Sequence, residues 1–168
     1  CNFRCLHCQN WSISQPEKDV IEGQVVSPEK VVQNALNSGC LSISYTYTEP
    51  TIYFETAFEI SQLARQKGLK NVFVTNGYIS PDALNGLAPY LDAANIDLKA
   101  MSDSFYREVC GAKLKPVLDR IKQYYELGIW IEITTLIIPG YNDKDDELEA
   151  IAQFIADIDR EIPWHISA

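Results

Sequence analysis

The stretch Leu41-Ser42-Ile43-Ser44-Tyr45-Thr46-Tyr47-Thr48 alternates strictly between apolar or aromatic residues and small hydroxyl residues. Successive side chains of a β-strand point to opposite faces of a sheet, so this pattern predicts a strand with one apolar face and one polar face. A strand covered on both sides in a parallel sheet would be apolar at nearly every position. The stretch therefore indicates a sheet that helices cover on one side only.

The same alternation returns in later segments of the chain. We expect strands over 41–47, 71–75, 94–99 and 129–138, and a last strand at Trp164. The polar residues that share the inner face of these strands are Ser42, Ser44, Thr46, Thr48, Asn95, Asp97, Lys99, Glu132, Thr134, His165 and Ser167. If the sheet curls, these side chains line one polar interior.

Helix signals lie between the expected strands. Ser27-Pro28 and Ser80-Pro81 mark helix starts, because the serine hydroxyl caps the first turn and proline fits its first position. Gly39, Gly68 and Gly128 mark helix ends. Alternating strands and helices predict an α/β fold with a parallel sheet and right-handed crossovers. The polar interior favours an open or partial barrel over a closed (β/α)8 barrel, whose interior is apolar; an open doubly wound sheet is the alternative.

Composition limits the class of protein. The chain has 168 residues, of which 46% are hydrophobic and 22% charged, and these values predict one globular domain with its own core. The apolar runs are strand-sized, so no membrane association is expected. A formal net charge of −9 argues against binding nucleic acid through its phosphates, which requires a basic face.

The first residues form the motif C-x3-C-x2-C, with Cys1, Cys5 and Cys8. Three thiolates this close repel one another unless a cation neutralises them, so the motif predicts a metal site. Structural zinc usually has four protein ligands, and here no second cysteine pair supplies them; His7 is the alternative fourth ligand. The more specific interpretation is a 4Fe-4S cluster, because three cysteines leave one of its irons open to a substrate or cofactor. Cysteine usage also predicts a reducing, cytoplasmic location.

Other residues of interest also have structural explanations. We expect Cys40 and Cys110 to be buried thiols, because neither has a partner at ligand spacing. Asp97 and Lys99 share one strand face, where they could form an ion pair with no further role. Glu49 precedes the helix that Pro50 opens, and an acid there interacts favourably with the helix dipole.

Taken together, the motifs resemble the radical S-adenosylmethionine (SAM) superfamily. Within it, the chain is similar to the pyruvate formate-lyase activating enzyme branch, and closest to the AmmeMemoRadiSam system radical SAM enzyme group. The motifs that carry the resemblance are the cysteine loop, Tyr47-Thr48-Glu49-Pro50, Val74-Thr75-Asn76-Gly77, Asn95-Ile96-Asp97-Leu98-Lys99-Ala100, Glu108-Val109-Cys110-Gly111-Ala112, Ile137-Ile138-Pro139-Gly140-Tyr141-Asn142-Asp143 and Pro163-Trp164-His165-Ile166-Ser167.

The resemblance implies the roles of individual residues. Cys1, Cys5 and Cys8 would hold the 4Fe-4S cluster, whose fourth iron binds SAM. The residues implied to contact SAM are His7, Gln9, Thr48, Glu49, Asn76, Asp97, Lys99, Thr134 and His165. Two positions depart from the family pattern. Tyr47 and Thr48 replace the glycines of its Gly-Gly-Glu motif, and Val74 replaces an acid that helps bind a monovalent cation, so we expect no such cation.

The resemblance also implies the activity. It predicts an enzyme that reductively cleaves SAM at the cluster to a 5′-deoxyadenosyl radical for hydrogen abstraction. The implied fold is a partial (β/α)6-type TIM barrel, with residues 1–168 forming a single core domain that is truncated at both ends and lacks the strand before Cys1. The implied partners are a reductant such as flavodoxin or ferredoxin and a small-molecule or protein substrate of the glycyl-radical type. The alternative is a noncatalytic iron-sulfur electron-transfer or structural metal-binding module.

Overall fold

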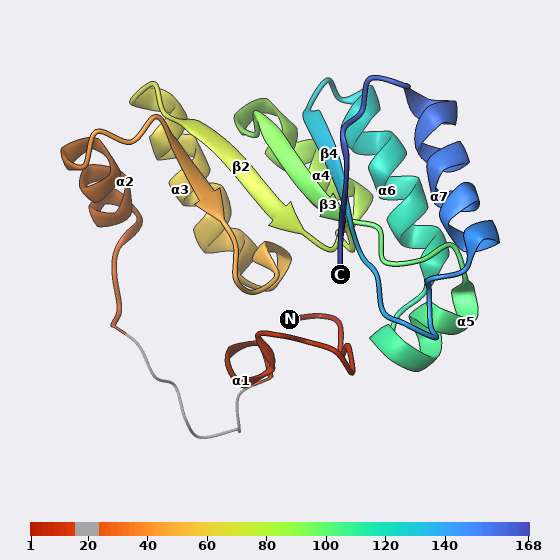
Figure 1. Ribbon diagram of the computed structural model, residues 1–168. Helices are drawn as coiled ribbons and strands as arrows, with labels where there is room; N and C mark the ends of the chain where they lie inside the picture. Colours follow the sequence, from red (N-terminus) through yellow and green to blue (C-terminus); the bar gives the residue numbers. More distant parts are fainter. Residues whose placement is uncertain (16–23) are drawn as a thin grey trace.

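A twisted five-stranded sheet forms the centre of the computed structural model, which describes residues 1–15 and 24–168 (Figure 1). All four strand pairs are parallel, and the strands lie in sequence order. They are β1 (Ser42–Tyr45), β2 (Lys70–Thr75), β3 (Ala93–Asp97), β4 (Trp130–Leu136) and β5 (Trp164–Ser167). A doubly wound sheet would reverse its strand order at a switch point, and this sheet does not, so the partial-barrel prediction is confirmed.

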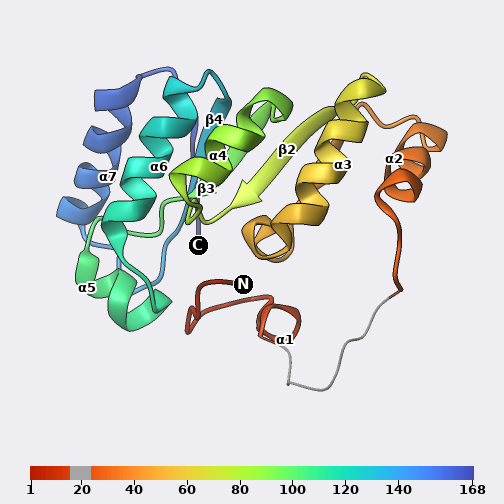
Figure 2. The same cartoon turned by 180° about the vertical axis from the view of Figure 1, so that it is seen from behind.

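The helices that connect the strands cover one face of the sheet, as the view from behind shows (Figure 2). The longer helices are α2 (Pro28–Asn37), α3 (Phe54–Gln66), α4 (Pro81–Leu87), α6 (Leu114–Glu126) and α7 (Asp145–Ile158), and the short ones are α1 (Trp11–Ser14), α5 (Asp103–Phe105), the 3-10 turns Pro50–Tyr53 and Ala88–Tyr90, and the π-helical turn Tyr106–Cys110. Within the described ranges, no helix has the length and apolar character needed to cross a membrane.

The core lies between the sheet and this helix layer. Phe73 of β2, Ile96 of β3 and Ile133 of β4 are fully buried, and they meet Val117 and Ile121 of α6 in the same apolar cluster. Alternate residues of the same strands remain partly exposed on the opposite face. In β3 and β4 the alternation separates a packed outer face from a polar inner face, as predicted, whereas the inner face of β2 carries Val72 and Val74.

Helix starts follow the sequence signals. The hydroxyl of Ser27 accepts a hydrogen bond from Lys30 N, and the hydroxyl of Ser80 accepts one from Ala83 N. Ser102 caps the short helix α5, since its hydroxyl accepts a hydrogen bond from Phe105 N, and α5 continues directly into the π-helical turn Tyr106–Cys110, which the sequence did not predict. This extension brings Cys110 next to the cysteine loop, where its carbonyl accepts a hydrogen bond from Arg4 N (2.9 Å).

The first strand is shorter than predicted. We expected residues 41–47, whereas β1 covers Ser42–Tyr45, and Leu41 and Tyr47 are 83% and 75% exposed. The expectation that both side chains pack under helices is therefore wrong. Leu41 precedes the first ladder pair, and Tyr47 lies beyond the last one, so neither side chain is held against the helix layer. The sequence between the cysteine loop and about residue 26 reads as a polar stretch without a strand or helix signal. Residues 16–23 of this stretch lie outside the described residues.

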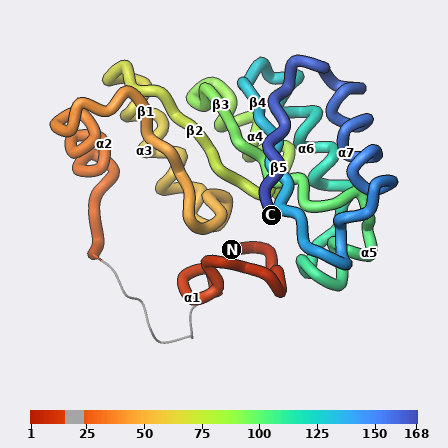
Figure 3. Tube along the Cα trace, viewed as in Figure 1, coloured from red at the N-terminus to blue at the C-terminus, as the bar shows by residue number. Residues whose placement is uncertain are grey.

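The cysteine loop and α1 lie below the carboxyl ends of the strands, toward which all five strands run (Figure 3). In α/β barrels this end carries the functional site, because the loops that follow the strands meet there.

Gly77 allows a test of the turn that follows β2. Its φ of +72° is left-handed, and an added Cβ would lie 3.0 Å from Cγ2 of Ile96 in the packed core. We expect Gly77→Ala to lower the free energy of unfolding by about 1–3 kcal/mol, measured by denaturant titration. The matched control is Gly86→Ala, since Gly86 lies in α4 with open space around it and alanine favours the helix there by up to about 1 kcal/mol. Equal effects at both glycines would contradict the packing described for this turn.

Candidate functional site

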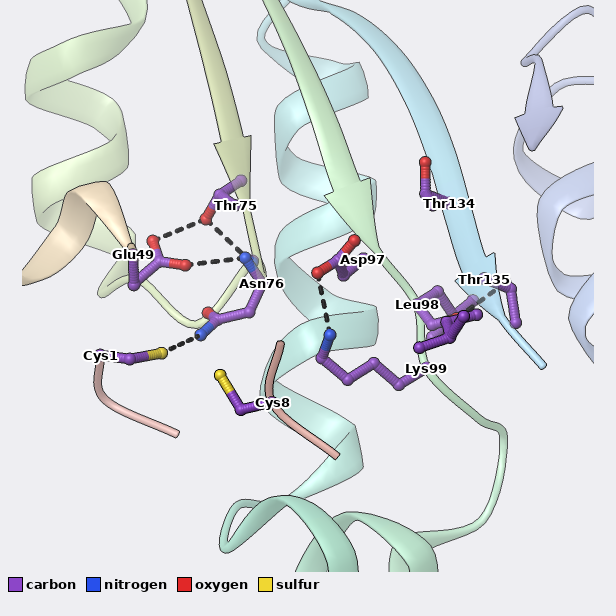
Figure 4. Close-up of polar contacts among 12 residues, drawn as sticks. Cys1, Cys8, Glu49, Thr75, Asn76, Asp97, Leu98, Lys99, Thr134 and Thr135 are labelled. Carbon is purple, nitrogen blue, oxygen red and sulfur yellow. Dashed lines mark hydrogen bonds and ion pairs between the residues drawn. The ribbon is translucent and has the colours of Figure 1, made fainter. Parts of the chain in front are cut away.

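A cavity of about 500 Å³ lies between the cysteine loop and the carboxyl ends of the strands. The three motif cysteines contribute to its wall from below, and residues that end β1 to β4 contribute from above. The predicted site residues that line it are Cys1, Cys5, His7, Cys8, Gln9, Thr48, Glu49, Asn76, Asp97, Lys99 and Thr134. Segments distant in sequence are thus brought around one space, as Figure 4 shows for the side chains that it labels.

The cysteine loop is held by contacts on both sides. Cys8 N donates to Cys5 O (3.2 Å), which closes a turn between two of the motif cysteines. Asn76 Nδ2 points to Cys1 Sγ at 3.8 Å, and the Cys8 thiol lies 3.4 Å from the Ser14 hydroxyl. Phe3 is 2% exposed and packs edge-on against Tyr106. The loop is therefore anchored by its own buried aromatic residue while its thiols face the cavity.

The chemistry of these donors fits an iron-sulfur cluster. All three thiols are free and only partly buried, and thiolates are the usual ligands of such clusters. Among the described residues, no three His, Cys, Asp or Glu side chains already converge on the position of one metal ion. The ligands of a cubane cluster bind separate irons, so they need to surround a larger group rather than meet at a point. Thiols spread around a cavity wall fit such a cluster better than a single zinc ion, whose ligands must converge on one point.

Glu49 joins the ends of two strands. Its Oε1 accepts hydrogen bonds from Thr51 N (3.2 Å), Thr51 Oγ1 (2.6 Å) and Thr75 Oγ1 (2.7 Å), and its Oε2 accepts one from Asn76 N (2.8 Å). Burial raises the pKa of this carboxyl, and the hydrogen bonds oppose that rise. Each carboxylate oxygen has two acceptor positions, so Oε2 keeps one for a donor in the cavity.

Asp97 and Lys99 form an ion pair at the end of β3, with 2.8 Å between Oδ2 and Nζ. Burial favours the neutral amine, but the adjacent carboxylate holds the pKa of Lys99 above its ordinary value. The backbone N–H of Lys99 also donates a hydrogen bond to the hydroxyl of Tyr106 (3.1 Å). The pair therefore presents one carboxylate and one ammonium group to the cavity in a fixed arrangement.

His7 carries an unsatisfied polar atom. Its Nδ1 is buried and has no hydrogen-bond partner within the described part of the chain. Burial lowers the pKa of its imidazole, which favours the neutral ring. A buried nitrogen without a partner is costly, so a ligand in the cavity would relieve this cost if it offered a hydrogen-bonding group.

His165 lies apart from the other predicted residues. It is not in the cavity wall; its Nε2 lies 2.9 Å from Oε2 of Glu132, farther along the inner face. This pair holds the pKa of Glu132 below its ordinary value. Thr134, which lines the cavity, is paired with His165 in the β4–β5 register, so the two residues are neighbours on the inner face of the sheet.

The structure also shows features that the sequence analysis missed. Tyr47 has a φ of +72°, an uncommon conformation for a residue other than glycine, and its carbonyl accepts a hydrogen bond from Asn10 Nδ2 (2.9 Å). The substitution of tyrosine for the family's glycine was the available signal. Cys110 is buried as expected, but Cys40 is exposed, so that prediction is wrong. Cys40 follows the left-handed Gly39 between α2 and β1, outside the packed layers.

A parallel half-barrel with a thiol-lined cavity at its carboxyl end defines a class of iron-sulfur protein, and comparisons with known proteins agree. The sequence profile of the Radical SAM superfamily matches residues 1–155. The chain therefore belongs to the radical SAM superfamily. Binding of SAM and of an iron-sulfur cluster is implied by this membership.

Curated relatives place the chain near activating enzymes. It is 50% identical over 168 residues to an uncharacterized protein of Methanocaldococcus jannaschii, MJ0808, covering 99% of this chain and 50% of the relative. A putative glycyl-radical enzyme activating enzyme of the same organism, MJ1632, is 29% identical (99% and 63% covered). Pyruvate formate-lyase 1-activating enzyme of Escherichia coli K12 is 21% identical (94% and 66% covered). The chain thus spans between half and two thirds of the length of these relatives.

Solved structures share the fold. The structure of Streptococcus suis SuiB bound to precursor peptide SuiA superposes with a TM-score of 0.72 at 17% identity, covering 99% of this chain and 36% of that one. This similarity supports the same arrangement of strands and helices.

Glu49→Gln tests the junction between the two strand ends. The amide has one acceptor oxygen, so its NH2 group would face either the Asn76 N–H or the hydroxyl and N–H donors around Oε1. We expect the free energy of unfolding to fall by about 1–3 kcal/mol, measured by denaturant titration. The control is Glu59→Gln on the exposed face of α3, which should change it by less than about 0.5 kcal/mol. An unchanged free energy of unfolding in Glu49→Gln would show that these hydrogen bonds do not hold the strand ends together.

Proposed function

We propose that this protein is a radical SAM enzyme in which Cys1, Cys5 and Cys8 bind a 4Fe-4S cluster and the polar strand ends bind SAM. When bound, the cluster and SAM together supply a 5′-deoxyadenosyl radical that abstracts hydrogen from a substrate. The observation that carries the proposal is the single cavity whose wall combines the three thiols with the ends of β1 to β4. Residues 1–168 would form one core domain, since one apolar cluster underlies the whole sheet.

The chain's own residues would bind and orient the cofactor. SAM carries an ammonium, a carboxylate, a sulfonium and a ribose, so its site needs charges of both signs and hydroxyl partners. Asp97 and Lys99 offer an acceptor and a donor 2.8 Å apart, and Oε2 of Glu49 has a free acceptor position directed at the same cavity. Asn76 contributes from the next strand end and also holds Cys1. His7, Gln9, Thr48 and Thr134 would complete the contacts from the wall.

His165 would act at a distance from this group. We propose that it approaches the ribose from the β5 side, because it shares the inner face with Thr134. Its pairing with Glu132 would orient the ring.

The substrate class follows from the relatives and remains a proposal. The named relatives include a putative glycyl-radical enzyme activating enzyme, so a protein substrate of the glycyl-radical type is favoured, with a small-molecule substrate as the other candidate. A one-electron donor such as flavodoxin or ferredoxin would supply the reductant. The motifs around Cys110 and Asn142 favour assignment to the AmmeMemoRadiSam system radical SAM enzyme group.

Cys5→Ala tests the cluster assignment. Each motif thiolate binds one iron, so its loss should prevent assembly, whereas Cys40→Ala removes an exposed thiol outside the site. After anaerobic reconstitution, we expect about four irons per chain in the unmodified protein and in Cys40→Ala, and almost none in Cys5→Ala. Iron uptake by the unmodified protein without release of 5′-deoxyadenosine from SAM and dithionite would favour a noncatalytic electron-transfer or structural module instead.

Asp97→Asn separates SAM binding from cluster assembly. Asparagine keeps the size of the side chain but removes the charge that pairs with Lys99. Loss of a charge-assisted hydrogen bond corresponds to about 1.5–3 kcal/mol, so we expect SAM affinity to fall about tenfold or more with iron content unchanged. Equilibrium binding of SAM to the reconstituted protein provides the measurement. Asp119→Asn, which removes a similar pair with Lys115 on the exposed face of α6, is the control and should leave affinity unchanged.

A further inference from the structure

Beyond Asp97 the chain leaves the β3–β4 ladder and is held by side chains instead. The last pair of this ladder is Asp97 with Thr134. Leu98 N still donates to Thr134 O (3.0 Å), and the hydroxyl of Thr135 donates to Leu98 O (2.8 Å). Lys99, one residue further, lies outside the ladder, so its backbone N–H and C=O need partners of another kind.

Asn142 supplies the partner for the carbonyl of Lys99. Its Nδ2 donates to Lys99 O (2.7 Å) and to Leu136 O (2.9 Å), and its Oδ1 accepts from Ile138 N (2.6 Å). Asn142 is 1% exposed, and the opposite orientation of its amide would set the oxygen against two carbonyls, so these partners fix which atom is the nitrogen. The amide therefore joins the end of β4 to the segment that follows β3.

The residues that Asn142 joins carry part of the cavity wall. Asp97, Lys99 and Leu136 line the cavity, whereas Asn142 does not. The backbone N–H of Lys99 donates to the hydroxyl of Tyr106, so side chains from two other segments hold both of its backbone polar groups. From this fixed backbone the Lys99 side chain reaches Asp97, with 2.8 Å between Nζ and Oδ2. A shift of the Lys99 backbone would therefore displace the ion pair in the cavity.

We propose that Asn142 is a positioning residue for SAM: it holds the backbone of Lys99 against the end of β4 and thereby fixes the Asp97–Lys99 pair in the geometry that binds the cofactor. The inference rests on the proposed function, because it takes Asp97 and Lys99 as SAM contacts. It also gives a role to the motif at residues 137–143, none of which lines the cavity.

Equilibrium binding of SAM to the reconstituted protein tests the proposal. Asn142→Ala removes both donors, so the Lys99 carbonyl loses its partner. We expect SAM affinity to fall about two- to tenfold, the effect of one net hydrogen bond, with iron content unchanged. Asn142→Asp keeps an acceptor for Ile138 N but not the two donors, so it should not restore the affinity. Full affinity in Asn142→Asp would overturn the proposal, because the contact with Ile138 would then be sufficient.

Asn71 provides a matched control. It is also buried; its Nδ2 donates to the carbonyls of Ser61 and Tyr90, both at 2.9 Å, and its Oδ1 accepts from the Tyr45 hydroxyl (3.0 Å). It lies near the amino end of β2 and does not line the cavity. Asn71→Ala should therefore lower stability as Asn142→Ala does, but leave SAM affinity unchanged. Equal losses of affinity in the two variants would overturn the proposal, since a general loss of stability would explain both.

A double-mutant cycle shows whether Asn142 acts through the ion pair. Asp97→Asn already removes the charge that Asn142 would position. Asn142→Ala should therefore lower SAM affinity much less in the Asp97→Asn background than in the unmodified protein. Additive effects of the two substitutions on affinity would overturn the proposal, because Asn142 would then act independently of the pair.

If Asn142→Ala does not fold, hydrogen exchange in the unmodified protein decides. The Ile138 amide donates to Asn142, so SAM bound at the Asp97–Lys99 pair should slow its exchange, because coupling between two sites is reciprocal. Unchanged exchange of the Ile138 amide would overturn the inference while leaving the proposed function intact. Failure of the unmodified protein to bind a cluster or SAM would instead refute the proposed function itself.

Discussion

Phe73, Ile96 and Ile133 point from neighbouring strands into the helix layer. Because successive side chains of a strand alternate between faces, the residues directly before and after each of them face the other side of the sheet. Apolar burial, at about 25 cal/mol per Å², therefore fixes the direction of the polar side chains as firmly as that of the core. Because the strands are parallel, their carboxyl ends lie along one edge. The polar residues that extend past this edge become the wall of a single cavity.

The polar groups of that cavity are expensive to bury unless they are paired. The chain meets this requirement with its own side chains at two strand ends: Glu49 is satisfied by Thr51, Thr75 and Asn76, and Asp97 pairs with Lys99. These contacts hold the side chains in place without a bound molecule. Two exceptions, the unpaired Nδ1 of His7 and the left-handed backbone of Tyr47, belong to residues of the cavity wall.

The cysteine loop is held by the strand ends and by the Tyr106–Cys110 turn. Asn76, which follows β2, contacts Cys1, while the carbonyls of Val109 and Cys110 accept hydrogen bonds from the loop backbone. The chain belongs to the radical SAM superfamily and spans half of the length of MJ0808. The described residues thus enclose one cavity whose wall combines the cysteine loop with the ends of the strands.

The sequence by itself determined the α/β class, the polar inner face and the three-cysteine motif, because these depend on local periodicity and spacing. Ser42 and Ser44, Asn95 and Asp97, and Glu132 and Thr134 could be assigned to one face from alternation alone. Only the tertiary structure decided that two of the four hydrogen bonds accepted by Glu49 come from Thr75 and Asn76, that His165 pairs with Glu132, and that Cys40 is exposed while the carbonyl of Cys110 accepts a hydrogen bond from Arg4 N. Those contacts join residues far apart in the chain, so their formation depends on how the elements pack, which no local pattern encodes.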